Sequence, residues 1–204
     1  MLRYFIIFAL LLSEICALAI PMELGKVVDS VPVDFDYFID TSGKITIDDL
    51  KAKSDELGFK HGAAGLLSLG FVDSPIWLRV DVNNSQSIEE LFITIMPALA
   101  DYIELYNPDG KGGFEKHLMG DKVPYQKREY KYRAPTLKFS PQTGQSTIYF
   151  RVKSGGDIRY HFWIFDRNSY EKHMWDTDFV MSMMLGIFLI MIVYNLVLFL
   201  SFRT

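Results

Sequence analysis

The sequence predicts a mainly β fold: a jelly-roll-like antiparallel β-sandwich with one short helix, followed by a C-terminal transmembrane helix. Three observations lead to this prediction. The middle of the chain holds several short runs in which apolar and polar residues alternate, as in strands with one buried face. Residues 179–202 form an uncharged apolar run near the C-terminus. Residues 1–19 have the composition of a secretory signal peptide.

The predicted signal peptide has a basic start at Arg3, an apolar stretch at residues 4–12 and a small-x-small triplet ending at Ala19. We expect cleavage after Ala19, and an uncleaved anchor is the alternative. A lipid anchor at Cys16 is disfavoured because the bulky Ile15 precedes it. Without Cys16 the mature chain has no cysteine, which excludes a disulfide framework and a thiol nucleophile.

The extracytoplasmic domain is expected at residues 20–176. Three runs alternate between apolar and other residues: 76–82, 102–106 and 147–153. Three further strands are expected at residues 37–39, 91–96 and 160–166. Turn residues separate the runs, and we interpret Ser154–Asp157 as a hairpin loop. Seven to nine short strands in one domain indicate a β-sandwich or jelly roll.

One helix interrupts the strand pattern. Thr46 can cap its N-terminus, and Asp49 stands three residues later in a position like that of a capping box. The helix is expected to continue through Glu56. The domain as a whole is mildly acidic, which argues against nucleic acid as a partner.

The C-terminal segment, residues 177–204, is expected to be a transmembrane helix with a very short cytoplasmic end. At ~1.5 Å per residue, its 24-residue apolar run makes a helix of about 36 Å, enough to cross a hydrocarbon core of ~30 Å. Asp176 and Asp178 precede the run and Arg203 follows it, which favours a cytoplasmic C-terminus.

Three residues of this span predict contacts with other helices. Ser182 and Gly186 stand four apart, a small-xxx-small spacing that permits close helix approach. The amide of Asn195 needs a hydrogen-bonding partner in hydrocarbon, typically on a neighbouring helix. The span is therefore expected to pack in a bundle.

Five motifs occur in order: GFxDxxxWLR from Gly70, ADxIELY from Ala100, GDxxP from Gly120, YFRV from Tyr149, and YNL from Tyr194 inside the span. Together they resemble the extracellular domain, type 2, of the bacterial seven-transmembrane receptors with diverse intracellular signalling modules. The resemblance implies a jelly roll similar to carbohydrate-binding modules, seven helices, and a cytoplasmic output such as a histidine kinase or diguanylate cyclase. By this comparison six helices and the output module are missing, so a truncated receptor is expected. A natural short protein stays open as the alternative.

If the even residues of the strand at 76–82 face the core, the odd residues of three strands form one polar face. An aromatic ring with flanking charged groups is what sugar binding requires, because the ring covers the C–H face and fixed polar groups bind the hydroxyls. The nine candidate ligand-binding residues are Trp77, Arg79, Asp81, Tyr102, Glu104, Tyr106, Tyr149, Arg151 and Lys153.

Other interpretations of this face remain open. Arg79 and Arg151 can instead hold a carboxylate or phosphate. The face can also be merely solvated or covered by loops, with Trp77 in the core and Arg79 paired to Asp81 or Glu104. Two further residues, Arg128 and Arg133, are candidates for the rim, and a basic surface loop is the simpler interpretation of them.

We expect no enzyme, no cofactor and no metal site. The four histidines, His61, His117, His161 and His173, do not have the short spacing of a metal-binding pair. The sequence has no Gly-x-Ser-x-Gly motif, and its adjacent carboxylates are of the kind usually found solvated.

The function expected is extracytoplasmic sensing of a ligand, a carbohydrate or small organic anion, by part of a bacterial membrane receptor. The alternative is an autonomous membrane-anchored binding or scaffold protein that pairs with another membrane protein. An extracytoplasmic enzyme is a third, disfavoured possibility. The expected location is the bacterial inner membrane, with the domain periplasmic or extracellular. Expected partners are the ligand, the bilayer, and other transmembrane helices or a signalling protein.

Overall fold

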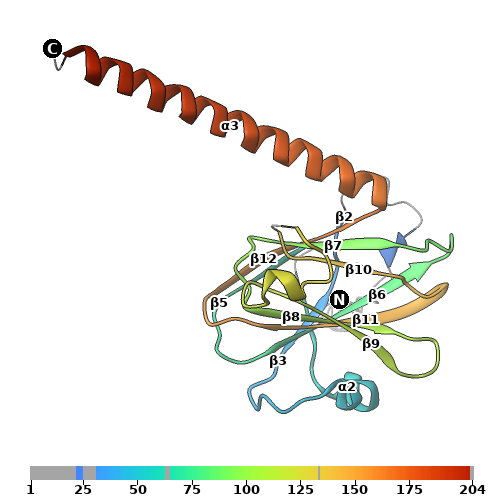
Figure 1. The fold of residues 1–204 in the computed structure, drawn as a ribbon. Coiled ribbons are helices and arrows are strands. Elements are labelled where there is room, and N and C mark those ends of the chain that lie inside the picture. Colours follow the sequence, from blue (N-terminus) through green and yellow to red (C-terminus); the bar gives the residue numbers. More distant parts are fainter. Residues whose placement is uncertain (1–21, 25–30, 63–64, 133, 203–204) are drawn as a thin grey trace, which may run out of the picture.

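The computed structural model describes residues 22–24, 31–62, 65–132 and 134–202. The predicted signal peptide and Arg133 lie outside these residues. The described strands form two sheets packed face to face, with the long C-terminal helix on one side (Figure 1). The predicted class, a mainly β sandwich followed by a helix, is confirmed.

The first sheet has seven strands, in the order β4–β3–β6–β11–β8–β9, with β1 paired to β6. The β1–β6 pair is parallel and the other pairs are antiparallel. The strands are β1 (Met22–Glu23), β3 (Asp36–Ile39), β4 (Lys60–His61), β6 (Ile76–Asn84), β8 (Tyr102–Pro108), β9 (Phe114–Met119) and β11 (Gly144–Lys153).

The second sheet has five strands, in the order β10–β7–β12–β2, with β5 also paired to β12. On the edge of β12 away from β7, residues 157–161 pair with β5 and residues 163–164 pair with β2. The strands are β2 (Val31–Pro32), β5 (Leu66–Phe71), β7 (Leu91–Met96), β10 (Thr136–Phe139) and β12 (Asp157–Phe165).

The core lies between the sheets and follows the alternation of the sequence. In β6 the even residues Ile76, Leu78, Val80 and Val82 are buried in the main apolar cluster, which also contains residues of β7, β8, β11 and β12. Each strand expected from the sequence is present, and β7 has the predicted bounds. The interpretation of residues 154–157 as a hairpin loop was wrong, because β11 and β12 belong to different sheets and this loop crosses between them.

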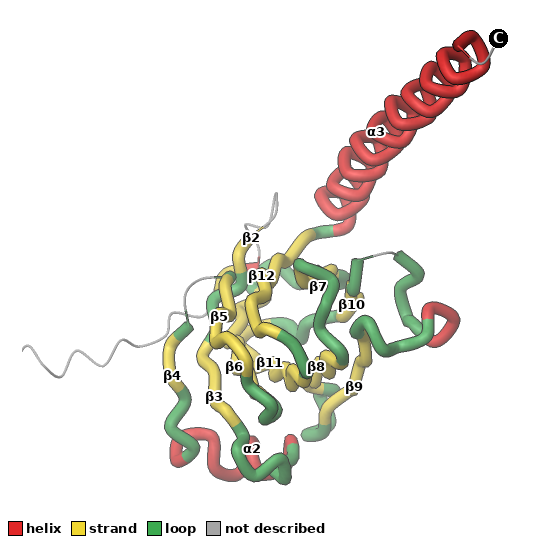
Figure 2. Tube along the Cα trace, turned by 90° about the vertical axis from the view of Figure 1, so that its left-hand side faces the viewer, coloured by secondary structure: helices red, strands yellow, loops and turns green. Residues whose placement is uncertain are grey.

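The predicted short helix is α2 (Ile47–Lys53), and it continues as the 3-10 helix η2 (Ser54–Glu56). Both bonds of the capping box are formed: Asp49 N–H donates to Thr46 Oγ1 at 3.3 Å, and Thr46 N–H donates to Asp49 Oδ2 at 2.9 Å. Two views place α2 on the first sheet, at the end of the molecule away from the C-terminal helix (Figures 1 and 2).

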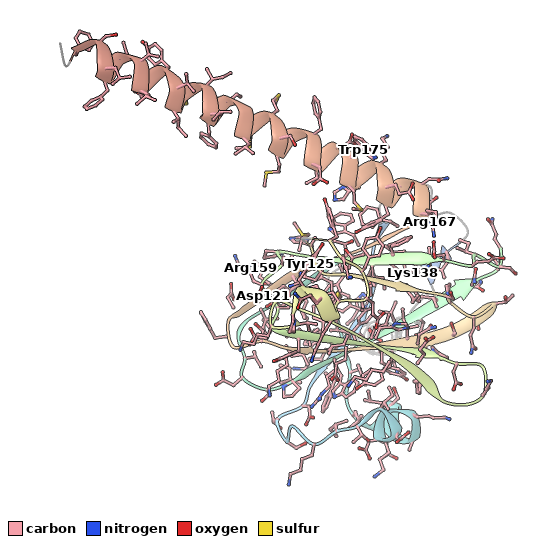
Figure 3. The ribbon with its side chains drawn as sticks, viewed as in Figure 1. Asp121, Tyr125, Lys138, Arg159, Arg167 and Trp175 are labelled. Carbon is pink, nitrogen blue, oxygen red and sulfur yellow. The ribbon has the colours of Figure 1, made fainter. Side chains whose placement is uncertain are left out.

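The C-terminal helix α3 (Arg167–Phe202) is continuous over 36 residues. It is the one helix in the described part of the chain that is long and apolar enough to cross a membrane, and none of its most apolar window is buried. Its first turn is fixed to the second sheet, because Arg167 and Lys138 both form ion pairs with Glu90 (Figure 3). The helix therefore leaves the domain from a defined position.

Candidate functional site

The nine candidate ligand-binding residues lie on the outer face of three adjacent strands of the first sheet. The strand register places Trp77 opposite Arg151 and Arg151 opposite Glu104. It also places Tyr149 between Arg79 and Tyr106, and Lys153 opposite Tyr102. The sequence pattern thus predicted correctly which residues share a face.

Helix α2 covers one half of this face. Trp77 is 1% exposed and Tyr149 is 7% exposed. Both pack in a second apolar cluster with Leu50 of α2, to which side chains of β3, the flanking loops and β9 contribute. Lys51 Nζ donates to the carbonyl oxygen of Gly112 at 2.5 Å, which ties the helix to the β8–β9 turn. The Trp77 ring is therefore a core side chain in this structure and offers no open face for a sugar.

Arg79 is also in the half of the face that α2 covers, and it pairs with Asp36, a partner that the sequence did not suggest. Its Nη2 donates to Asp36 Oδ2 at 2.8 Å and its Nη1 to Ser54 Oγ at 3.1 Å. Its guanidinium carbon lies 5.0 Å from the centre of the Phe59 ring. Asp81 instead accepts a hydrogen bond from Thr147 Oγ1 at 2.6 Å. Arg79 thus links its own strand β6 to β3 and to η2.

The electrostatics of Asp36 fit this structural role. Burial works to raise its pKa, but the hydrogen bonds from Arg79 and His61 outweigh burial, and the pKa lies below its ordinary value. His61 Nδ1 lies 3.1 Å from Asp36 Oδ1. The charged form of Asp36 is stabilised by the fold.

The other half of the face is more accessible, and we call it the open half. Tyr102 is 41% exposed and Leu118 is 37% exposed. The side chains of Arg151 and Glu104 are 27% and 17% exposed. The open half consists of Tyr102, Glu104, Leu118, Arg151 and Lys153.

Glu104 is the centre of a hydrogen-bonded network in the open half. It accepts hydrogen bonds from Lys116 Nζ at 2.6 Å and from Tyr106 Oη at 2.8 Å. Burial works to raise the pKa of Glu104, but these bonds and Arg151 hold it below its ordinary value. Burial, and then Glu104, raise the pKa of Tyr106. The network fixes a carboxylate and a phenol in defined positions.

Arg151 retains hydrogen-bonding capacity toward a ligand. Its Nη1 is 3.6 Å from Glu104 Oε2, longer than a hydrogen bond. Its Nε is buried and has no hydrogen-bond partner among the described residues, so only the exposed part of the side chain, 27% in all, can meet a ligand. Its guanidinium carbon lies 5.6 Å from the centre of the Trp77 ring, which supports it from below. Arg151 is thus a held cation that lies diagonally across the β8–β11 pair from the exposed Tyr102.

Arg133, one of the two rim candidates, lies outside the described residues. Arg128 donates through Nε to the carbonyl oxygen of Val123 at 3.1 Å, within its own loop. His117 Nδ1 lies 2.7 Å from Glu129. Within the described residues, no group of three or more His, Cys, Asp or Glu side chains is arranged to hold a metal ion.

The three residues expected to pack against other helices lie on two sides of α3. Asn195 follows Gly186 by nine residues, which at about 3.6 residues per turn puts it on the opposite side of the helix. Ser182 lies close to the Gly186 side. Asn195 Nδ2 donates to the carbonyl oxygen of Met191 at 2.7 Å, within the same helix. Its amide is therefore partly satisfied without a neighbour.

No curated protein matches the sequence. One similar solved structure is CsCBM6-3 from Clostridium stercorarium in complex with cellobiose: it is 13% identical, with a TM-score of 0.27, over 51% of this chain and 82% of that chain. At that TM-score the likeness supports no conclusion about this chain. The sequence profile of the family "7TMR-DISM extracellular 2" matches residues 33–166, well over half of the chain. The chain therefore belongs to the 7TMR-DISM extracellular 2 family.

Proposed function

We propose that this chain is the extracytoplasmic sensing part of a bacterial membrane receptor, with the β-sandwich outside the membrane and α3 crossing it. Membership of an extracellular domain family supports the location of the sandwich. The apolar helix that leaves the second sheet supports the membrane anchor. The role is binding rather than catalysis.

The ligand binds on the open half of the first sheet. The observation that carries this assignment is the position of Arg151. Its side chain is partly exposed, lies 3.6 Å from Glu104 without a hydrogen bond, and is diagonal in the strand register to the exposed Tyr102. Lys153, directly opposite Tyr102, adds a second cation. The ligand is a carbohydrate or a small organic anion. An acidic sugar combines the two classes: its sugar ring packs on the Tyr102 side chain, and its carboxylate pairs with Arg151.

The test is a thermal-shift screen of the full chain in lipid nanodiscs against neutral sugars, acidic sugars and small organic acids. A ligand at 100-fold excess over its Kd stabilises the folded state by about 2.7 kcal/mol. Tyr102→Ala and Lys153→Gln remove exposed side chains of the open half, so they should abolish the shift and leave the unliganded melting temperature nearly unchanged.

Matched control variants are Tyr125→Ala and Lys44→Gln, which remove an exposed tyrosine and an exposed lysine elsewhere. Both should keep the full thermal shift. A ligand that stabilises the wild type and the two open-half variants equally binds somewhere else, and the assignment of the site then fails.

The alternative function, an anchored binding or scaffold protein paired with another membrane protein, is favoured by one observation. Gly186 and Asn195 lie on opposite sides of α3, so the two features suit two separate neighbouring helices. Crosslinking in native membranes distinguishes the functions, because a scaffold forms a stable complex whether or not ligand is present.

A further inference from the structure

The loop between β9 and β10 runs beside α3 to the point where the apolar run begins. Tyr132 Oη donates to Asp178 Oδ1 at 3.1 Å. Asp178 is the last charged residue before the 24-residue apolar run. A carboxylate is costly in hydrocarbon, so this turn of α3 marks the bilayer surface if α3 crosses the membrane. Tyr132 therefore lies at the depth of the lipid headgroups.

Aromatic contacts hold the loop in this place. Tyr130 packs against Tyr170 of α3 with ring centres 5.4 Å apart. Tyr130 also lines a cavity of about 280 Å³ together with Trp175 and other residues of α3. The 3-10 helix η3 (Tyr125–Lys127) lies in the same loop, and Tyr125 Oη donates to the carbonyl oxygen of Lys131 at 3.1 Å. The loop is thus internally braced and fixed to the helix.

The loop has the composition of a membrane-interface segment. Residues 125–132 contain three tyrosines, three basic residues and one carboxylate. Tyr125 is 54% exposed and Trp175 is 78% exposed, and in the view of Figure 3 both are on the side of the sandwich from which α3 leaves. Tyr and Trp favour the headgroup region, where one end of the ring is apolar and the other wet.

The charges of the loop favour a phosphate partner. Lys127 and Lys131 are exposed, and the structure gives neither an ion pair within the described residues. Most nearby carboxylates are already engaged. Glu129 pairs with His117 at 2.7 Å, Glu171 with Arg167 at 3.6 Å, and Asp178 accepts from Tyr132. Asp121 and Asp176 are the nearby carboxylates for which the described residues provide no hydrogen bond or ion pair.

We propose that residues 125–132, together with Trp175, form a surface that binds the phospholipid headgroups of the leaflet entered by α3. Lys127 and Lys131 pair with lipid phosphate, and Tyr125 and Trp175 lie in the interface. The inference rests on α3 crossing the bilayer but is independent of the ligand site. Its consequence is that the second sheet is held close to the membrane while the open half of the first sheet, beside α2 on the other side, stays accessible.

The test measures the depth of a nitroxide on the full chain in nanodiscs that contain a nickel-chelating lipid. Cys16 is the only cysteine, so a Cys16→Ser background allows single labels. Labels are placed at Gln126 in the loop, at Ser42 near α2 and at Ile190 within the span. Nickel at the headgroups should relax the label at Gln126 severalfold more than the label at Ser42. Equal relaxation at these two sites overturns the proposal, as does an aqueous environment at Ile190, because α3 then does not cross the membrane.

A charge-reversal arm tests whether the headgroups are bound or merely close. In nanodiscs rich in anionic phosphatidylglycerol, the double variant Lys127→Glu/Lys131→Glu should lose most of the nickel effect at Gln126. The control Lys44→Glu/Lys60→Glu, which reverses two exposed lysines elsewhere, should retain it. If loop and control reversals leave the effect unchanged, headgroup binding is refuted. A label at Gln126 that is immobile yet unaffected by nickel indicates a protein partner and also overturns the proposal.

Discussion

Phe92 of β7 and Tyr170 of α3 stack face to face, with ring centres 4.6 Å apart and ring planes 1° from parallel. Phe165, at the end of β12, meets the edge of the same tyrosine at 5.9 Å. Tyr170 is 1% exposed, and its hydroxyl donates to Thr136 Oγ1 of β10 at 3.1 Å. One side chain of the helix thus contacts three strands of the second sheet. Because of these contacts, a displacement of that sheet would also displace the start of α3.

Removal of this contact should destabilise the sandwich. Tyr170→Ala deletes a buried aromatic ring, for which about 3–5 kcal/mol of unfolding free energy is expected. The measurement is denaturant unfolding of the full chain in detergent micelles, followed by far-UV circular dichroism. The control Trp175→Ala removes a 78%-exposed ring one and a half turns later and should change the free energy by less than about 0.5 kcal/mol. Equal effects of the two variants would show that α3 is not docked through Tyr170.

The buried position of Trp77 leads to a second prediction. Trp77→Ala should lower the free energy of unfolding by about 3–5 kcal/mol, because it leaves a cavity beneath α2. Tyr102→Ala, in the open half, should cost less than about 1 kcal/mol. Urea unfolding of the two variants in parallel tests this difference. A Trp77→Ala protein that keeps wild-type stability would mean that the ring is not part of a core.

A third prediction concerns Gly120, which has φ +137 and whose added Cβ would lie 2.9 Å from Tyr102 Cα and closer still to the Asp101 carbonyl oxygen. Backbone strain of this kind costs of order 1–3 kcal/mol, and the clash adds to it, so Gly120→Ala should destabilise by about 3 kcal/mol or more. Gly43→Ala is the control, since Gly43 also has positive φ, +65, but open space around it. The control should cost about 1–2 kcal/mol. Similar melting temperatures for the two variants would contradict the close approach at Gly120.

A fourth prediction follows from the lowered pKa of Asp36. A carboxyl with a depressed pKa in the folded state stabilises the fold at pH values above its unfolded pKa of about 3.8, and this stabilisation is lost as the pH falls through the folded pKa. The stability difference between wild type and Asp36→Asn should therefore be constant at neutral pH and shrink below about pH 4. Unfolding free energies measured as a function of pH give this difference directly.

The same series with the exposed Asp73→Asn serves as the control, and little difference from wild type is expected at any pH. If the Asp36→Asn difference persisted unchanged into strong acid, the Asp36–Arg79 ion pair would not be its cause. Arg79→Met should remove part of the same pH dependence, because it deletes the partner at 2.8 Å and leaves His61 in place.

The sequence predicted the fold where the signal is local. Alternation in β6, β8 and β11 is a direct consequence of the two-residue period of a strand, and it placed Trp77, Glu104 and Arg151 on one face. The strands β1, β2, β4, β5, β9 and β10 escaped prediction. Phe114–Met119 contains charged and apolar residues without a clear period, because β9 is an edge strand whose two faces are both partly exposed.

The candidate site was predicted in part. The alternation of residues predicted that the nine side chains share one face of the sheet. It did not predict which of them are accessible to solvent. Half of the face is buried because Leu50 of α2, which is 27 residues before Trp77 in the chain, packs in the same cluster as Trp77. Similarly, Arg79 pairs with Asp36, 43 residues away, rather than with the neighbouring Asp81. Such partners depend on the order of strands in the sheet, which no local pattern encodes.

The sequence by itself determined the mainly β class, the capped helix at Thr46, the apolar run of α3 and the motifs of the family, because each depends on residues close together in the chain. Only the tertiary structure decided that Trp77 is buried, that Tyr102, Glu104 and Arg151 belong to an open half, and that Tyr132 reaches Asp178. The physical reason is that burial and pairing depend on which distant segments pack together. The apolar run and Tyr170 belong to the same helix, α3, and Tyr170 fixes that helix to the second sheet.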